Sequence, residues 1–96
     1  MSTQSPASYG GRGPHPEALW HVYILKCADG THYVGKTKNL DDRLHRHNMK
    51  QVSYTCSRLP IELITWITFT DEWKAVLMEK YLKSGSGRAF AKRHLI

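Results

Sequence analysis

The chain has 96 residues, a length that suits one small domain built around a single core. Hydrophobic residues make up 41% of the sequence and charged residues 23%, which is typical of a globular chain rather than a disordered one. No apolar run approaches the roughly 18–20 residues that cross a bilayer, and no secretory signal is recognisable at the N-terminus. The sequence therefore argues against a membrane protein.

The charge balance favours an anionic partner. Fourteen Lys and Arg residues against eight Asp and Glu give a net charge of +6, and no acidic residue follows Glu79. A compact basic domain of this size most often binds nucleic acid. The alternative is that the charge only keeps the chain soluble.

The two cysteines, Cys27 and Cys56, do not show the Cys-x-x-Cys spacing of a structural zinc site and are too few for a disulfide scaffold. Free thiols favour a reducing compartment, so we expect a cytoplasmic, intracellular protein. Residues 1–18 are rich in Ser, Gly and Pro and lack a hydrophobic period, which predicts a flexible N-terminal leader. The folded domain is predicted over residues 19–96.

A hairpin is predicted at the start of the domain. The run 20–27 is aromatic and β-branched on both faces, as in a central strand, and a turn signal at 28–30 leads to a second strand at 31–35.

The length of this turn decides where two tyrosines lie. A two-residue loop would place Tyr23 and Tyr33 on opposite faces of the hairpin. A three-residue loop with a left-handed Gly30 pairs Leu25 with Tyr33 and Tyr23 with Gly35. We predict the three-residue loop, with both tyrosines on one face.

A helix capped by Asn39 follows, with acidic residues in its first turn. One face holds Leu40, Leu44 and His47, whereas Arg43, Arg46 and Lys50 lie away from the leucines or at their edge. Residues 50–60 are predicted to form a loop, and 61–69 a third strand.

The second helix is predicted from a Thr70 cap to about Lys83 and to be largely buried, because it is apolar around much of its circumference. Residues 84–87 should break it, and a short basic helix should follow at 88–94. Three tryptophan and methionine side chains are assigned to the core: Trp66, Trp73 and Met78. The order of elements predicts an α/β (α+β) fold with a three-stranded, mostly antiparallel sheet flanked by helices.

A set of ordered motifs runs through these elements: His21-Val22-Tyr23, Tyr33-Val34-Gly35, Lys36-Thr37, Asn39-Leu40, Arg43, His47-Asn48, Ser53-Tyr54-Thr55, Leu59-Pro60 and Glu79. At these spacings they resemble the GIY-YIG nuclease family, in particular its small stand-alone, single-domain members, over roughly residues 20–95. The resemblance implies the GIY-YIG nuclease fold and a metal-dependent endonuclease that hydrolyses DNA phosphodiester bonds.

The resemblance also implies a set of site residues. Catalytic roles fall to Tyr23, Tyr33, Arg43, His47 and Glu79, with Glu79 as the ligand of Mg²⁺ or Mn²⁺ and Gly35 as a close-packing glycine. The sequence departs from the family pattern at His21, where the family has glycine, and at Val22 and Val34, where it has isoleucine. Residues 84–87 lack the asparagine that some members place there.

These residue types suit phosphodiester hydrolysis. Arg43 offers a planar, permanently charged fork for a phosphate, and a single carboxylate on Glu79 suits one hard cation completed by water. Tyr23 or Tyr33 could activate the water, which requires nearby cations to lower the tyrosine pKa from about 10. We favour Tyr23 as the base, with His47 sharing the proton.

Each assignment has an ordinary structural alternative. The tyrosines could be strand aromatics, Arg43 a solvated charge, and His47 a packing residue. Glu79 could pair with Lys83 on the helix surface, which is worth only about 0.2–0.5 kcal/mol. Its apolar neighbours one turn earlier favour a partly buried acid with a metal or base nearby.

Further basic residues are predicted to bind the nucleic acid: Lys36, Lys38, Arg46, Arg88, Lys92 and Arg93. They suit phosphates rather than bases, so we expect weak sequence specificity and single-stranded, branched or damaged DNA as substrate, as in DNA repair, with a possible larger repair partner. The alternatives are a non-catalytic nucleic-acid-binding module of the same fold and a protein-interaction domain. The oligomeric state is left open.

Overall fold

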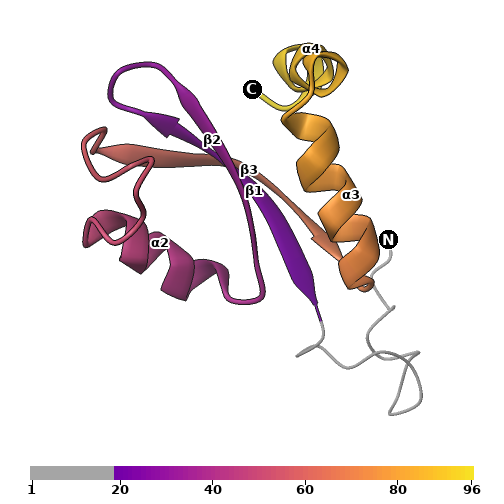
Figure 1. The fold of residues 1–96 in the computed structure, drawn as a ribbon, viewed down its shortest axis with the longest axis horizontal. Helices are drawn as coiled ribbons and strands as arrows, with labels where there is room; N and C mark the ends of the chain where they lie inside the picture. The colour runs from indigo at the N-terminus through magenta and orange to yellow at the C-terminus, as the bar shows by residue number, and fades with distance from the viewer. Residues whose placement is uncertain (1–18) are drawn as a thin grey trace, which may run out of the picture.

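The computed structural model describes residues 19–96, and its elements follow the predicted order. They are β1 (Trp20–Cys27), β2 (His32–Thr37), α2 (Leu40–Asn48), β3 (Ile61–Phe69), α3 (Glu72–Leu82) and α4 (Gly85–His94). The three strands form one antiparallel sheet in the order β2-β1-β3, with α2 on one side and α3 and α4 on the other (Figure 1). The predicted fold class is confirmed. The leader predicted over residues 1–18 lies outside the described residues.

The central strand β1 is buried on both faces, as its unbroken apolar sequence predicts. Val22 and Ile24 pack against Ala75, Leu82 and Ala91 of the two C-terminal helices. Side chains of this size contribute roughly 1.5–3 kcal/mol each when fully buried. Tyr23 and Leu25 point to the opposite face and are also inaccessible to solvent. Within residues 19–96 no helix is long and apolar enough to cross a membrane.

The hairpin has the predicted three-residue loop. Tyr23 pairs with Gly35 and Leu25 with Tyr33, while Gly30 takes a φ of +87° and donates its N–H to the Cys27 carbonyl at 3.0 Å. Because residues paired across a sheet share a face, Tyr23 and Tyr33 lie on the same side. The second strand runs to Thr37, two residues beyond the predicted end.

Of the two predicted helix caps, one is confirmed and one is wrong, and the last helix begins earlier than predicted. Asn39 caps α2 by accepting the Asp42 N–H at 3.0 Å. The cap of α3 is Asp71, not Thr70, because the Asp71 carboxylate accepts the Trp73 N–H at 2.9 Å. Helix α4 begins at Gly85 rather than Arg88, since the Ser84 hydroxyl accepts the N–H of Gly87 and caps the helix earlier.

The prediction that α3 is largely buried is wrong. Only Ala75 and Leu82 of this helix are buried, whereas Trp73 is 64% exposed and Leu77 47% exposed. The helix packs on the sheet with one side, and none of the described elements covers its outer side. Trp66 on β3 is likewise exposed, so of the three residues assigned to the core only Met78 packs against it.

Candidate functional site

A chain of three polar side chains lies between the hairpin and α2. The Tyr23 hydroxyl is 3.0 Å from His47 Nε2, and His47 Nδ1 is 2.7 Å from the Thr55 hydroxyl. Thr55 in turn donates to the Val52 carbonyl at 3.4 Å. The donors are all used if His47 donates from Nδ1 to Thr55 and accepts the Tyr23 proton at Nε2. The imidazole is thereby held at both nitrogens.

Burial sets the protonation of this chain. It raises the pKa of the Tyr23 hydroxyl above its ordinary value, and neighbouring Tyr33 adds to the effect, while the Arg43 guanidinium opposes it. Burial, followed by the positive charge of Arg43, lowers the pKa of His47. Both side chains are therefore uncharged at neutral pH, and the imidazole is able to accept a proton.

The second hairpin tyrosine is more accessible. The Tyr33 ring meets the edge of the His47 ring, with 5.0 Å between centroids, and lies 6.1 Å from the Tyr23 ring. Its other neighbour is Tyr54, at 5.5 Å. Tyr33 is only half-buried, whereas Tyr23 is inaccessible to solvent. Of the two tyrosines, Tyr33 is the one that solvent reaches.

The loop after α2 is fixed to the hairpin turn by Arg58. Its guanidinium bonds to Asp29 at 3.0 Å and to the Tyr54 carbonyl at 2.6 Å, and it lies 4.1 Å from the centre of the Tyr54 ring. Hydrogen bonds from Thr31, and then Arg58 itself, hold the pKa of the Asp29 carboxyl below its usual range. These contacts position Tyr54 beside Tyr33.

Gly35 lies directly beneath the Tyr23 ring. A Cβ at this position would collide with the Tyr23 hydroxyl and ring, which are themselves fully buried and have no space to move. The hairpin register pairs Tyr23 with Gly35, and the Tyr23 ring lies across β2 at that residue, so only glycine leaves room for it.

The structure brings four of the five predicted catalytic side chains together and leaves one apart. Arg43, half-buried on α2, lies close enough to Tyr23 and His47 to shift both pKa values, and Tyr33 completes the cluster. Glu79 lies on α3, which covers the opposite face of the sheet. Its carboxylate accepts from Lys83 Nζ at 2.9 Å, the pairing that the ordinary alternative foresaw.

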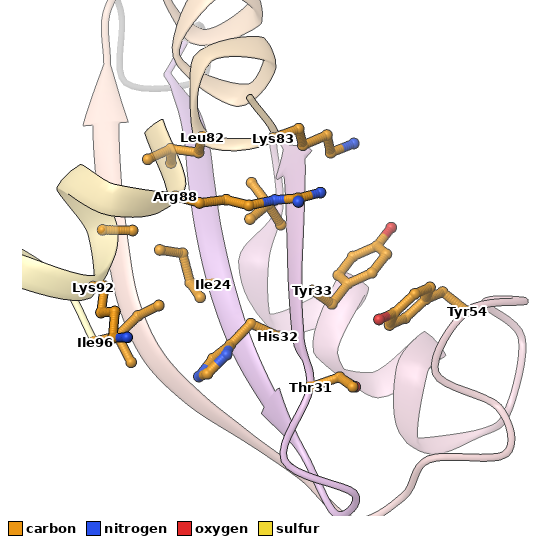
Figure 2. A pocket seen from close by; sticks show the side chains of 12 residues that line it. Ile24, Thr31, His32, Tyr33, Tyr54, Leu82, Lys83, Arg88, Lys92 and Ile96 are labelled. Carbon is orange, nitrogen blue, oxygen red and sulfur yellow. The ribbon is translucent and has the colours of Figure 1, made fainter. Parts of the chain in front are cut away.

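A cavity of about 800 Å³ lies at the β2 edge of the sheet, between the cluster around Tyr33 on one face and Glu79 on the other. Tyr33 and Tyr54 line it from the α2 side, and Lys83, Arg88 and Lys92 line it from α3 and α4 (Figure 2). Lys83 is the partner of Glu79, so the acid lies next to the cavity wall although it does not line the cavity itself.

Few oxygen donors surround Glu79 for a divalent cation. Among residues 19–96, no group of three or more His, Cys, Asp and Glu side chains converges on a point. Glu79 is 24% exposed, and Lys83 is the partner recorded for its carboxylate. Mg²⁺ commonly binds through one or two carboxylates, with water and substrate phosphate completing its shell. Glu79 fits such a shared site and does not fit a metal site made by protein ligands alone.

The predicted nucleic-acid-binding residues fall into separate groups. Lys36 and Lys38 lie over the Trp20 ring, 4.2 and 5.3 Å from its centre, and Lys36 also approaches Glu72 at 3.8 Å. Arg88 and Lys92 line the cavity, whereas Arg46 on α2 and Arg93 on α4 are exposed. Of the six, only Arg88 and Lys92 therefore lie at the cavity, and the basic residues do not form one patch.

Reasoning from the sequence missed several members of the site. Thr55 holds His47, Arg58 holds Tyr54, and Lys83 joins Glu79 to the cavity wall. The segment Ser53-Tyr54-Thr55 belongs to a motif of the sequence analysis, but a threonine in a loop does not by itself indicate a hydrogen bond to a helix. Only the fold brings them to His47.

The comparisons with known proteins agree with this architecture. The model of the GIY-YIG catalytic domain matches residues 19–93, which implies a nuclease-type function with DNA as the substrate class. The chain is 35% identical over 78 residues to the UPF0213 protein SAG0778 of Streptococcus agalactiae, covering 77% of this chain and 89% of the relative. It is 40% identical over 65 residues to a UPF0213 protein of Pediococcus pentosaceus, covering 67% and 68%.

A solved structure is also similar. The solution NMR structure of the UPF0213 protein BH0048 from Bacillus halodurans aligns with a TM-score of 0.52 and 33% identity, over 78% of this chain and 81% of that one. The chain therefore belongs to the GIY-YIG family, and its fold is that of the UPF0213 structure.

The buried His47 predicts a pH dependence of stability. Its pKa in the folded protein lies below the ordinary 6.5, so the unfolded chain binds more protons as the pH falls. The contribution to the free energy of unfolding is complete above the ordinary value and is lost as pH falls through the lowered one. Urea unfolding between about pH 7.5 and 5 should show this loss for the wild type.

His47→Gln should unfold with a weaker pH dependence over the same range, and His94→Gln, which alters an exposed side chain, should keep the wild-type dependence. Equal slopes for His47→Gln and the wild type would show that His47 is not held neutral by burial.

Proposed function

We propose that the chain is a metal-dependent DNA endonuclease that hydrolyses phosphodiester bonds at the edge of β2. The observation that carries the proposal is the convergence of Tyr23, Tyr33, Arg43 and His47 beside a cavity that has one cationic wall. Membership of the GIY-YIG family supports it. Hydrolysis needs an activated water, charge neutralisation on the phosphate and a proton for the leaving oxygen.

Arg43 is the residue proposed to hold the scissile phosphate. Its guanidinium is half-buried beside two uncharged side chains, Tyr23 and His47, and no carboxylate between residues 19 and 96 pairs with it. A permanent positive charge in such a place attracts an anion strongly because little water screens it.

The tyrosine that activates water is proposed to be Tyr33, which revises the earlier preference for Tyr23. A basic Tyr23 requires a lowered pKa, but its burial raises the pKa, and none of its surface is exposed. Tyr33 lines the cavity and is only half-buried, so solvent and substrate can reach its hydroxyl. Tyr23 is then a positioning residue, which holds the His47 imidazole through its hydrogen bond to Nε2.

Paired substitutions test this division. Tyr33→Phe should lower the cleavage rate by about 100-fold or more with little effect on stability. Tyr23→Phe should instead destabilise the fold by about 1–3 kcal/mol, because it leaves the buried His47 Nε2 without a donor. Single-turnover cleavage and urea unfolding measure the two effects. If Tyr23→Phe loses more activity than Tyr33→Phe while still folded, Tyr23 is the activating residue.

Glu79 is proposed to hold Mg²⁺ or Mn²⁺ together with a substrate phosphate. A bound divalent cation would stabilise negative charge on the phosphoryl and leaving oxygens. Lys83 Nζ donates to the Glu79 carboxylate at 2.9 Å, and the Lys83 side chain remains 54% exposed, so it is free to swing to a phosphate.

Labelled single-stranded, duplex and branched DNA, with and without Mg²⁺ or Mn²⁺, tests the function directly. We expect metal-dependent internal cuts that Glu79→Gln reduces by about 100-fold or more, with DNA binding retained. Glu72→Gln is the matched control, because Glu72 lies on the same helix, is exposed, and among residues 19–96 forms an ion pair only with Lys36, at 3.8 Å.

Salt-sensitive binding without cutting under any metal condition would favour the non-catalytic binding module. Equal activity of Glu79→Gln and wild type would remove Glu79 from the metal site. We further propose weak sequence specificity, because the basic side chains suit phosphates, which carry no sequence information. Action on single-stranded, branched or damaged DNA in cytoplasmic repair, with a larger partner, belongs to the same proposal.

A further inference from the structure

The cavity at the edge of β2 has an apolar floor. Ile24 of β1, Val34 of β2, Leu82 of α3 and Ala91 of α4 contribute aliphatic surface, and the volume is about 800 Å³. Pockets of this size accommodate organic ligands that bury most of their own surface. The floor lies on the sheet face opposite Tyr23, so it is separate from the Tyr23–His47–Thr55 chain.

The cavity wall formed by α3 and α4 is cationic. Arg88 and Lys92 are one turn apart on α4, and Lys83 ends α3 beside them. No Asp or Glu lines the cavity, and no carboxylate between residues 19 and 96 pairs with Arg88 or Lys92. The ends of Lys83 and Arg88 extend across β2 towards the side where the tyrosine rings lie (Figure 2). This wall attracts an anion.

The opposite wall is aromatic and polar. Tyr33 and Tyr54 stand side by side with ring centroids 5.5 Å apart, and Figure 2 shows both rings on the far side of β2 from α4. His32 lines the cavity from the other side of β2, towards α4, and its Nε2 atom is buried without a hydrogen-bond partner among the described residues (Figure 2). A buried unpaired ring nitrogen is costly unless a ligand supplies the missing bond.

We propose that this cavity binds one unpaired nucleotide of the substrate strand next to the cut. Arg88, Lys92 and Lys83 take its phosphates, the tyrosine wall and apolar floor take its base, and His32 Nε2 bonds to the base or sugar. The proposal rests on the proposed DNA-cleaving function and names the form of DNA that it selects.

An unpaired nucleotide fits better than a duplex. A ligand here must present an anion and a flat apolar face at the same time, because the cationic wall and the apolar floor belong to one cavity. In a duplex the faces of the bases are stacked inside the helix, and only phosphates and groove edges are exposed. A single strand can turn a base towards aromatic side chains while its backbone follows basic ones.

The test measures DNA binding without metal, so that it does not depend on cleavage. Fluorescence anisotropy compares an oligothymidylate of about ten nucleotides with a duplex of the same length, over a range of salt concentrations. The cavity variant is Arg88→Ala with Lys92→Ala. The matched control removes the same charge from the outer side of α3, Lys74→Ala with Lys80→Ala, where both side chains are exposed.

We expect the cavity variant to bind the single strand at least tenfold more weakly and to lose about two units of the salt slope, while duplex binding falls only as in the control. Tyr54→Ala should weaken single-strand binding about tenfold with the salt slope unchanged, because it removes a stacking surface and no charge. Unchanged unfolding midpoints would show that the variants are folded.

Three results would overturn the proposal: equal losses for single strand and duplex, equal losses for cavity and control variants, or no DNA binding at low salt. Competition with dTMP distinguishes a strand-binding site from a site for a free nucleotide. If dTMP displaces the oligothymidylate when the two are at equal concentration, the cavity is a free-nucleotide site and the proposal is wrong. If the protein binds single strands selectively but never cleaves them, the proposed nucleotide-binding role of the cavity is supported and the proposed endonuclease activity is contradicted.

Discussion

Replacing Arg43 by alanine should slow DNA cleavage by about 100- to 1,000-fold, the usual cost of removing one group that stabilises transition-state charge. The guanidinium lies beside Tyr23 and His47, two neutral groups. Among residues 19–96 it is the cation that shifts the pKa of both. Arg43→Lys should recover only part of the rate, since an ammonium keeps the charge but loses the planar fork. Single-turnover rates at saturating protein measure the loss in the chemical step.

Arg46→Ala provides the contrast on the same helix. Arg46 is exposed one turn further along α2, so its loss should weaken DNA binding in a salt-dependent way and leave the single-turnover rate nearly unchanged. If Arg43→Ala behaves like Arg46→Ala, Arg43 binds the backbone and does not act on the scissile phosphate. The stability of Arg43→Ala must also be measured, because the charge influences the buried His47.

Replacing Gly87 by alanine should lower the free energy of unfolding by roughly 3 kcal/mol, at the upper end of what overpacking costs. A Cβ at Gly87 would overlap the Tyr81 carbonyl group and come within 2.7 Å of Leu82 Cα. These are backbone atoms at the end of α3, and they cannot rotate away as a side chain can. The two helices would have to separate, which would expose Leu82 and Ala91 of the core.

Gly85→Ala is the matched control two residues earlier in the same helix. A Cβ at Gly85 would meet nothing within 4 Å, so stability should stay the same or rise by up to about 1 kcal/mol through the better helix propensity of alanine. Urea unfolding of the two variants separates packing from propensity. Equal midpoints for both variants would mean that α3 and α4 do not pack as closely as the structure indicates.

The hairpin was predictable because its determinants are local. Gly30 can adopt the left-handed conformation that a three-residue loop requires, and the loop length alone fixes that Tyr23 faces Gly35. The Asn39 cap was predictable for the same reason, since its hydrogen bond closes within three residues. Where one residue's geometry decides the outcome, the sequence is sufficient.

The burial of α3 was not predictable from its composition. The helix is rich in apolar residues, but which side is covered depends on where the sheet lies, and Trp73 and Leu77 point away from it. The predicted start of α4 was wrong for a different reason. Two glycines suggested a break, but Ser84 caps the helix ahead of them, and Gly87 serves the packing against α3.

The sequence predicted which residues belong to the candidate site, but only part of how they are arranged. The spacing of motifs led to Tyr23, Tyr33, Arg43 and His47, which the fold gathers on one face. That Tyr23 would be wholly buried, and that Glu79 would approach from the other face, depends on tertiary packing. Periodicity cannot reveal which of two tyrosines solvent will reach.

The position of β2 has a consequence for how a substrate enters. Among the strands of residues 19–96, β2 has a neighbour on one side only, and the cavity extends along its outer margin. A linear polymer can be laid sideways against such a margin at an interior position, so no terminus has to be inserted first. For the proposed nuclease we therefore expect scission within a strand rather than trimming from an end.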